Sequence, residues 1–261
     1  MVRDKVTIEI YSPIRQKKIR FSGEVGFAQF LQEKVEPLFS QAPLESVLNH
    51  AFQKVSVTDG LIAEFGVFSG RSINMIARHF GKSVVWGFDS FEGFECDWCP
   101  TSFGVKVGKK TFDRRDTLPQ VRDNVRLVKG FFHESLPTFL SRYHENFSFI
   151  HIDCDTYHGT KTIFELCEKQ IVPGTVIVFD EFFEYTHEAQ AFYEYIQTSG
   201  RSFNWLCYGG DTGMLFDKKA TKLMEKNFSF PMLIGWRLMH LFLPLFYRKK
   251  YITSAAAVII K

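Results

Sequence analysis

Apolar positions follow two different patterns along the chain. Between residues 24 and 55 they recur three and four positions apart, which is typical of helices that bury one face. From residue 60 onward, short apolar runs rich in β-branched residues alternate with helical stretches. We expect strands at residues 60–67, 83–89, 124–130, 147–153 and 175–181. Alternating strands and helices predict an α/β fold with a Rossmann-like, doubly wound and mostly parallel sheet.

The end of this pattern predicts a change of strand direction. Two further runs, 203–209 and 212–217, flank a short Gly-Asp turn and are expected to form a C-terminal antiparallel hairpin. A chain of 261 residues accommodates one such domain with additions at both ends. We therefore divide the chain into an N-terminal helical extension (1–59), an α/β domain (60–220) and a C-terminal tail (221–261).

The C-terminal tail differs from the rest of the chain in its charge and hydropathy. The whole chain has a formal net charge of +3, which is too small to indicate a nucleic-acid partner. Seven Lys/Arg against the single Glu225 give the tail +6, which leaves −3 for the remaining residues. Residues 228–247 are nearly all apolar and approach the ~20 residues that span a bilayer. Arg237 near their centre makes spanning costly.

Two interpretations of the tail remain open. With the basic residues 248–250, the segment 228–250 suits a peripheral contact with an anionic membrane surface. It also suits a helix packed on the domain or across a homodimer interface, which we favour. The first 18 residues lack the apolar core of a signal peptide, so we expect a cytoplasmic protein, membrane-associated only if the tail binds lipid.

The segment 94–123 is the one long irregular stretch of the α/β domain. A loop of this length in a compact domain is usually functional, often as a lid over a site. It contains Cys96 and Cys99 in a CxxC arrangement. A structural zinc site needs four N or S ligands, and the chain has no second pair of this kind. The pair does not open a thioredoxin-like βαβ unit either, so we expect reduced thiols.

The first three strands end in residues suited to a nucleotide-like cofactor, because ligands of such sheets bind beyond the carboxyl ends of the strands. The first strand runs into EFGVFSGRS (64–72), whose two glycines permit a tight turn before a helix N-terminus. The second ends at Asp89, about 20 residues further on, where a carboxylate can accept hydrogen bonds from ribose hydroxyls or cap a helix. We favour the ribose. The third leads into Gly130, which either borders an adenine or forms a plain turn.

The fourth and fifth strands end in a concentration of acidic residues. FIHIDCDTYHG places Asp153, Asp155 and His158 just past one strand end, and IVFDEFFEY places Asp180 and Glu181 past the next. Four carboxylates at adjacent strand ends repel one another unless a cation or shared protons intervene. Carboxylate oxygens are the ligands that Mg²⁺ prefers. We therefore favour metal binding or acid–base chemistry over the alternative, in which these acids cap turns on a solvated rim.

Taken together, these residues resemble the class I S-adenosylmethionine-dependent methyltransferases. More narrowly, the chain resembles the macrocin/mycinamicin O-methyltransferase family, which methylates deoxysugar hydroxyls of macrolide antibiotics. The similar segments are AEFGVFSGRS, GFDSFEGF, GFFHESLP, IDCDTY, VPGTVIVFDE and HEAQAFYEYI, in the family's order over about residues 60–200. The family usually has an Asp-Asp pair where this chain has Asp180-Glu181. Neither the lid nor the tail matches the family, so the resemblance does not extend to an antibiotic substrate.

The resemblance implies a role for each group of strand-end residues. Those expected to bind S-adenosylmethionine are Glu64, Gly66, Gly70, Ser72, Asp89, Ser90, Gly130, Phe131 and Asp153. Those expected to bind Mg²⁺ are Asp153, Asp155, Asp180 and Glu181. The acceptor would be a hydroxyl of a sugar or another small-molecule natural product, with its pKa lowered by the metal. Asp153, Asp155 or His158 would take its proton, and the oxygen would then attack the sulfonium methyl in line.

Two other functions fit the same elements. A nicotinamide-dependent oxidoreductase would use the same fold, but the chain lacks GxGxxG and its strand ends are crowded with carboxylates. A non-catalytic cofactor-binding or membrane-associated protein would keep the same binding residues, so only turnover of a substrate separates it from an enzyme.

Overall fold

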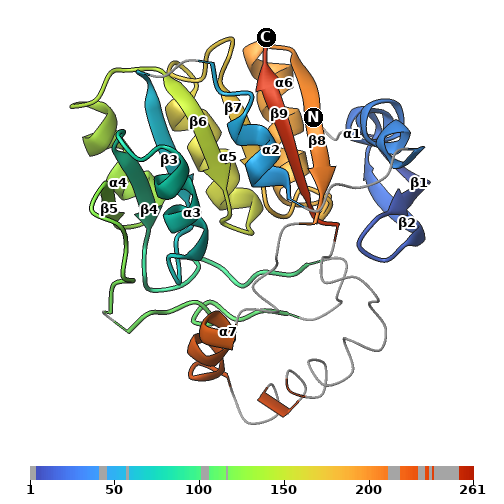
Figure 1. Cartoon of the computed structure of the whole chain (residues 1–261). Helices are drawn as coiled ribbons and strands as arrows, with labels where there is room; N and C mark the ends of the chain where they lie inside the picture. The colour runs from blue at the N-terminus through green and yellow to red at the C-terminus, as the bar shows by residue number, and fades with distance from the viewer. Residues whose placement is uncertain are drawn as a thin grey trace.

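A seven-stranded sheet organises the computed structural model of the chain (Figure 1). The structure describes residues 4–40, 46–56, 59–100, 106–115, 117–210, 218–228, 233–234, 237 and 253–261. Within them the strand order of the sheet is β5-β4-β3-β6-β7-β9-β8. A separate two-stranded sheet precedes it in the chain.

The parallel part of the sheet consists of the five predicted strands. They are β3 (Leu61–Phe65), β4 (Val85–Asp89), β5 (Val125–Lys129), β6 (Phe147–Ile152) and β7 (Val176–Phe179). From β3 the chain adds strands to one side, and from β6 it adds them to the other. The strand order therefore reverses between β3 and β6, which is where ligands bind in open α/β sheets.

Two antiparallel strands complete the sheet at its C-terminal side. β8 (Phe203–Gly209) is the edge strand, and β9 (Ala255–Ile260) lies between β7 and β8, antiparallel to both. The predicted Rossmann-like fold class with an antiparallel C-terminal end is thus confirmed. Residues 212–217, the expected partner of β8, lie outside the described residues, and the partner that the structure shows comes from the segment set apart as a tail.

Different helices cover the two faces of the sheet (Figure 1). They are α4 (Phe132–Leu140), α5 (Tyr157–Cys167) and α6 (Glu188–Ser199) on one face, and α2 (Val47–Phe52) and α3 (Arg71–His79) on the other. In β3, Ala63 and Phe65 belong to the core under α4, α5 and α6, and Ile62 belongs to the core under α2 and α3. This alternation follows from the pleat of a strand, which points successive side chains to opposite faces.

The N-terminal extension contains a β-hairpin in addition to the expected helices. β1 (Lys5–Ser12) and β2 (Lys17–Glu24) pair antiparallel along their whole length. The helical segments that follow are α1 (Val25–Phe30), a π-helical turn η1 (Leu31–Val35) and a 3-10 turn η2 (Glu36–Ser40). The indole of Trp205 on β8 donates a hydrogen bond to the carbonyl of Lys34 at 3.0 Å, which fixes this extension to the edge of the sheet.

Little of the C-terminal tail before β9 belongs to the described chain. The helix α7 (Lys218–Glu225) leads into it. Segment 228–250 falls almost wholly outside the described residues, so its membrane contact and its place in a homodimer stay predictions. None of the helices that the structure describes is long and apolar enough to cross a membrane.

The burial of β9 generates a test of its place in the sheet. Val258 is fully buried between the two cores, so Val258→Asp leaves an uncompensated charge there and should cost about 3–5 kcal/mol. Urea unfolding measures this cost, with Lys261→Asp at the exposed end of the strand as the control. If Val258→Asp unfolds at the same urea midpoint as the wild type, β9 is not part of the core.

Candidate active site

The loop after β3 is shaped by two glycines in left-handed conformations, with φ of 96° at Gly66 and 82° at Gly70. A Cβ at Gly66 would overlap the carbonyl oxygen of Asp153, so glycine is required for the ends of β3 and β6 to meet. The close approach at Gly66 is thus made to another part of the chain. Gly70 ends the loop and precedes the first turn of α3.

Asp89, at the end of β4, holds this glycine loop in place. Its Oδ2 accepts hydrogen bonds from the backbone N–H groups of Val67 and Phe68, both at 2.8 Å. Its Oδ1 accepts one from Phe91 at 2.7 Å. Burial raises the pKa of the Asp89 carboxyl, and the three N–H donors partly offset that shift. A carboxylate has about four acceptor positions, so one remains for a ligand hydroxyl.

The neighbouring candidates, Ser90, Gly130 and Phe131, lie around Asp89. The hydroxyl of Ser90 donates to the carbonyl of Gly93 at 2.7 Å and so stabilises the turn after β4. Gly130 N–H donates to the carbonyl of Asp89 at 3.0 Å, which brings the ends of β5 and β4 together. Phe131 immediately precedes α4. The structure therefore gathers the predicted cofactor residues of β3, β4 and β5 along one edge of the sheet.

Glu64 lies beneath the glycine loop in a fully buried pair with His151. Its Oε1 is 2.9 Å from Nδ1 of His151, and the two side chains are 0% and 1% exposed. Burial raises the pKa of Glu64, against hydrogen bonds from His151 and from Ser72 at the start of α3. Glu64 and Ser72 thus connect β3, β6 and α3, and position the loop from inside the protein.

The predicted acidic residues form a compact, half-buried cluster. Carboxylate oxygens of Asp153, Asp180 and Glu181 lie within 4.8 Å of one another. Burial raises the pKa of Asp153 well above its usual value, and the charge of Asp180 raises it further. The pKa of Glu181 is raised for the same reason, by burial and then by Asp155. The cluster therefore requires a bound cation or shared protons at neutral pH.

Asp155 belongs to this cluster, and His158 does not. Asp155 is buried in a left-handed conformation, with φ of 61°, and burial raises its pKa to about 7. A non-glycine residue with positive φ costs conformational energy and is often found at functional sites. His158 is exposed on α5, where its ring contacts Tyr157 at a centroid distance of 5.5 Å. Among the described residues, no hydrogen bond joins His158 to the acids.

Glu188 is a further member of the cluster that the sequence did not identify. It lies fully buried in the first turn of α6, and its Oε2 accepts a hydrogen bond from the N–H of Glu181 at 3.0 Å. Burial, and then the charge of Asp180, raises the pKa of Glu188. The acid in HEAQ, at the start of a helix, was the only sequence signal for it. Its contact fixes the turn that carries Glu181.

The described part of the segment 94–123 lies against the glycine loop and crosses the carboxyl edge of the sheet (Figure 1). The ring of Phe112 contacts those of Phe68 and Phe94 at centroid distances of 5.2 and 4.9 Å. The guanidinium of Arg114 lies 5.9 Å from the centroid of the Phe68 ring. Both thiols of the CxxC motif are free. These contacts support the interpretation of the segment as a lid over the cofactor loop.

Residues 63–182 match the model of a protein family described as a methyltransferase domain. The match spans the glycine loop, Asp89 and the acidic cluster through Glu181. No curated protein matches the chain.

Two solved methyltransferase structures are similar to this chain. The calicheamicin methyltransferase CalS11 is 20% identical, with 68% of this chain and 77% of that chain covered and a TM-score of 0.51. The O-methyltransferase NovP is also 20% identical, with 60% and 74% covered and a TM-score of 0.44. The likeness to CalS11 shows a common fold, and the macrocin/mycinamicin resemblance stays a prediction. Residues 63–182 therefore match a methyltransferase domain, and the predicted enzyme class, an S-adenosylmethionine-dependent methyltransferase, is confirmed.

Proposed function

We propose that the protein transfers a methyl group from S-adenosylmethionine to a hydroxyl oxygen of a sugar or another small-molecule natural product, with the assistance of a divalent metal. The observation that carries this proposal is the half-buried cluster of Asp153, Asp180 and Glu181 beside the glycine loop. A family match to methyltransferases favours methyl transfer over a nicotinamide-dependent reaction. Buried acids favour an oxygen acceptor that must lose a proton.

The residues around Asp89 fit a cofactor with a ribose. The carboxylate is fixed by three backbone donors and keeps an acceptor position for the ribose hydroxyls. Gly130 and Phe131, at the next strand end, lie beside Asp89 where an adenine would follow the ribose. Glu64 and Ser72 would affect cofactor binding indirectly, because their contacts stabilise the loop from inside the protein.

The acidic cluster fits a hard divalent cation such as Mg²⁺. Three carboxylates offer oxygens within 4.8 Å of one another, and Oε2 of Glu181 is buried without a hydrogen-bond partner among the described residues. Asp153, Asp180 and Glu181 would hold the ion, with Asp155 hydrogen-bonded to Glu181 beside them. When bound, the ion would supply Lewis acidity that lowers the pKa of the acceptor hydroxyl.

The remaining chemistry belongs to this chain's own residues. Asp155 or Asp153 would accept the proton of the acceptor hydroxyl, whereas His158 is exposed on α5. The glycine loop and the acids meet at Gly66 and Asp153, so the cofactor and the acceptor would be held side by side. Transfer of the methyl group then depends mainly on alignment of the attacking oxygen with the sulfonium.

Removal of the Asp89 carboxylate tests the cofactor site. Asp89→Ala should weaken S-adenosylmethionine binding more than tenfold, because each charge-assisted hydrogen bond contributes about 1.5–3 kcal/mol. Calorimetric titration of the cofactor measures this loss, with Asp59→Ala at an exposed position as the control. Unchanged affinity in Asp89→Ala would refute its assignment to the ribose.

Chelation tests the metal. Methyl transfer should stop in EDTA and return with Mg²⁺, and Asp180→Asn should weaken Mg²⁺ binding at least about tenfold, since even supporting residues of metal sites contribute that much. Glu165→Gln on the exposed side of α5 is the matched control. Full activity after exhaustive chelation would refute the metal site, and these acids would then act as bases or as turn caps.

A further inference from the structure

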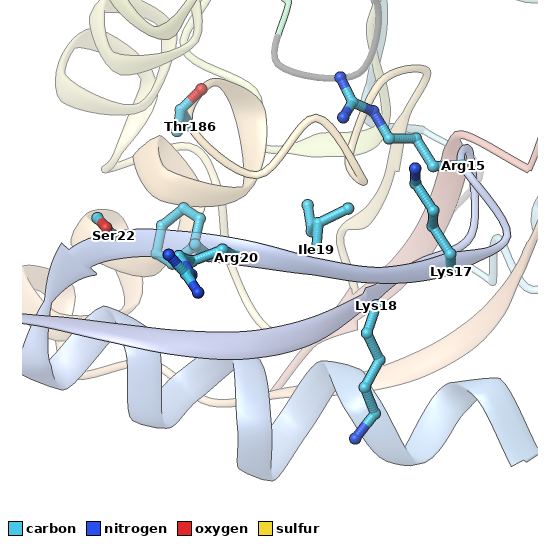
Figure 2. Close-up of a pocket in the computed structure, with 8 residues that line it drawn as sticks. Arg15, Lys17, Lys18, Ile19, Arg20, Ser22 and Thr186 are labelled. Atoms are coloured by element: carbon cyan, nitrogen blue, oxygen red, sulfur yellow. The ribbon is translucent and has the colours of Figure 1, made fainter.

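A second charged site lies on the N-terminal hairpin, away from the acidic cluster. A cavity of about 420 Å³ opens between β2 and the loop that follows β7 (Figure 2). Its polar lining consists of four cations and two hydroxyls, from Arg15, Lys17, Lys18, Arg20, Ser22 and Thr186. The volume falls within the roughly 300–1,000 Å³ of small-molecule sites.

The charge of this cavity is not balanced within the hairpin. Residues 11–22 hold these four cations and no acidic residue. In the strand register Lys17 lies opposite Ser12, Lys18 opposite Tyr11, and Arg20 opposite Glu9. Lys17, Lys18 and Arg20 form no ion pair with any residue that the structure describes. Cations gathered in this way repel one another, and a bound anion of high charge relieves that repulsion.

The side chains are directed so that part of this charge faces one space. Figure 2 shows Arg15 and Lys17 on the same side of the hairpin as Ile19, toward the loop of Thr186, whereas Lys18 points to the other side. The alternation of side chains along β2 explains the difference. Ile19 and the buried Phe21 supply an apolar wall. The cavity thus combines cations, hydroxyls and an apolar surface.

The cavity is connected to the acidic cluster by a short, fixed loop. Thr186 lies five positions after Glu181, which limits their Cα separation to at most about 18 Å. The hydroxyl of Tyr185 donates to the carbonyl of Tyr11 at 2.7 Å, and the Tyr185 side chain is 1% exposed. This buried bond fixes the hairpin to the loop, so the cavity keeps a fixed position relative to the acids.

We propose that this cavity binds a phosphate or diphosphate group of the methyl acceptor, so that the substrates are phosphorylated sugars or similar small molecules. The inference rests on the proposed function. Arginine offers paired donors that match phosphate oxygens, and lysine adds point charges. A neutral glycoside has no group that needs these cations. The acids repel an anionic group, which leaves the cations of the hairpin as its favourable position in the site.

Binding of anions to the full chain tests this site without any need for turnover. Inorganic pyrophosphate and UDP-glucose, as a model sugar diphosphate, are titrated calorimetrically into the wild type and into the double variant Arg15→Gln/Lys17→Gln, which alters the two cations on the cavity side of the hairpin. Lys5→Gln, an exposed lysine at the far end of the same hairpin, is the matched control. We expect at least a tenfold loss of affinity for both ligands in the double variant, none in the control, and unchanged S-adenosylmethionine binding.

Vesicles that contain phosphatidylglycerol separate a soluble phosphate ester from a lipid headgroup. The proposal requires UDP-glucose to bind more tightly than pyrophosphate and the vesicles to bind no more tightly to the wild type than to the double variant. It is overturned if neither soluble anion binds, if the double variant binds them as the wild type does, or if only vesicle binding falls. Methyl transfer is measured separately, so a failure of the proposed function stays distinct from a failure of this site.

Discussion

Repulsion between buried carboxylates at the carboxyl end of the sheet is the interaction on which the site depends. Backbone hydrogen bonds of the sheet hold the acids together: Asp153 N–H donates to the carbonyl of Phe65 at 2.8 Å, and Asp180 N–H donates to that of Ile152 at 3.0 Å. The buried core on both faces stabilises these bonds, so the side chains cannot relieve their repulsion by moving the strands. Neutralisation must therefore come from a bound cation or from protons.

The same constraint couples the acids to the cofactor loop. Gly66 lies directly against the carbonyl of Asp153, and Glu64 beneath the loop pairs with His151 two residues before Asp153. Asp89 then fixes the far side of the loop through Val67 and Phe68. A displacement of the acids would thus move the loop as well. Cofactor position and acceptor position are set by one rigid junction of β3 and β6, as in-line transfer requires.

The parts of this arrangement that sequence predicts are those determined by local pattern. The five parallel strands are continuous apolar runs, because both of their faces are buried, and Asp153, Asp155, Asp180 and Glu181 follow two of those runs directly. His158 follows the same strand, but the first turn of α5 directs it to solvent. Proximity in the sequence alone therefore does not show which of these residues the fold brings together, and the catalytic role expected of His158 stays a prediction.

The parts that sequence missed depend on tertiary contacts. β9 has the sequence AAAVII, in which alanine has a low strand propensity, and its partners β7 and β8 are remote in the chain. Glu188 occupies the first turn of a helix, where interaction with the helix dipole is enough to explain the presence of an acidic residue. Only the turn after β7 brings its carboxylate to the N–H of Glu181. Neither contact leaves a periodic pattern in the local sequence.

The net charge of the sequence does not reveal the cations of the hairpin, because the chain outside the tail carries a net charge of −3. The fold places them at one end of a loop whose other end carries the acidic cluster. Such a separation of charge orients an acceptor with one anionic end, because the acids repel that end and the cations attract it. In the proposed function, this leaves the hydroxyl end at the acids. A neutral acceptor would gain no such orientation, so the hairpin bears on which acceptor is selected rather than on the methyl transfer itself.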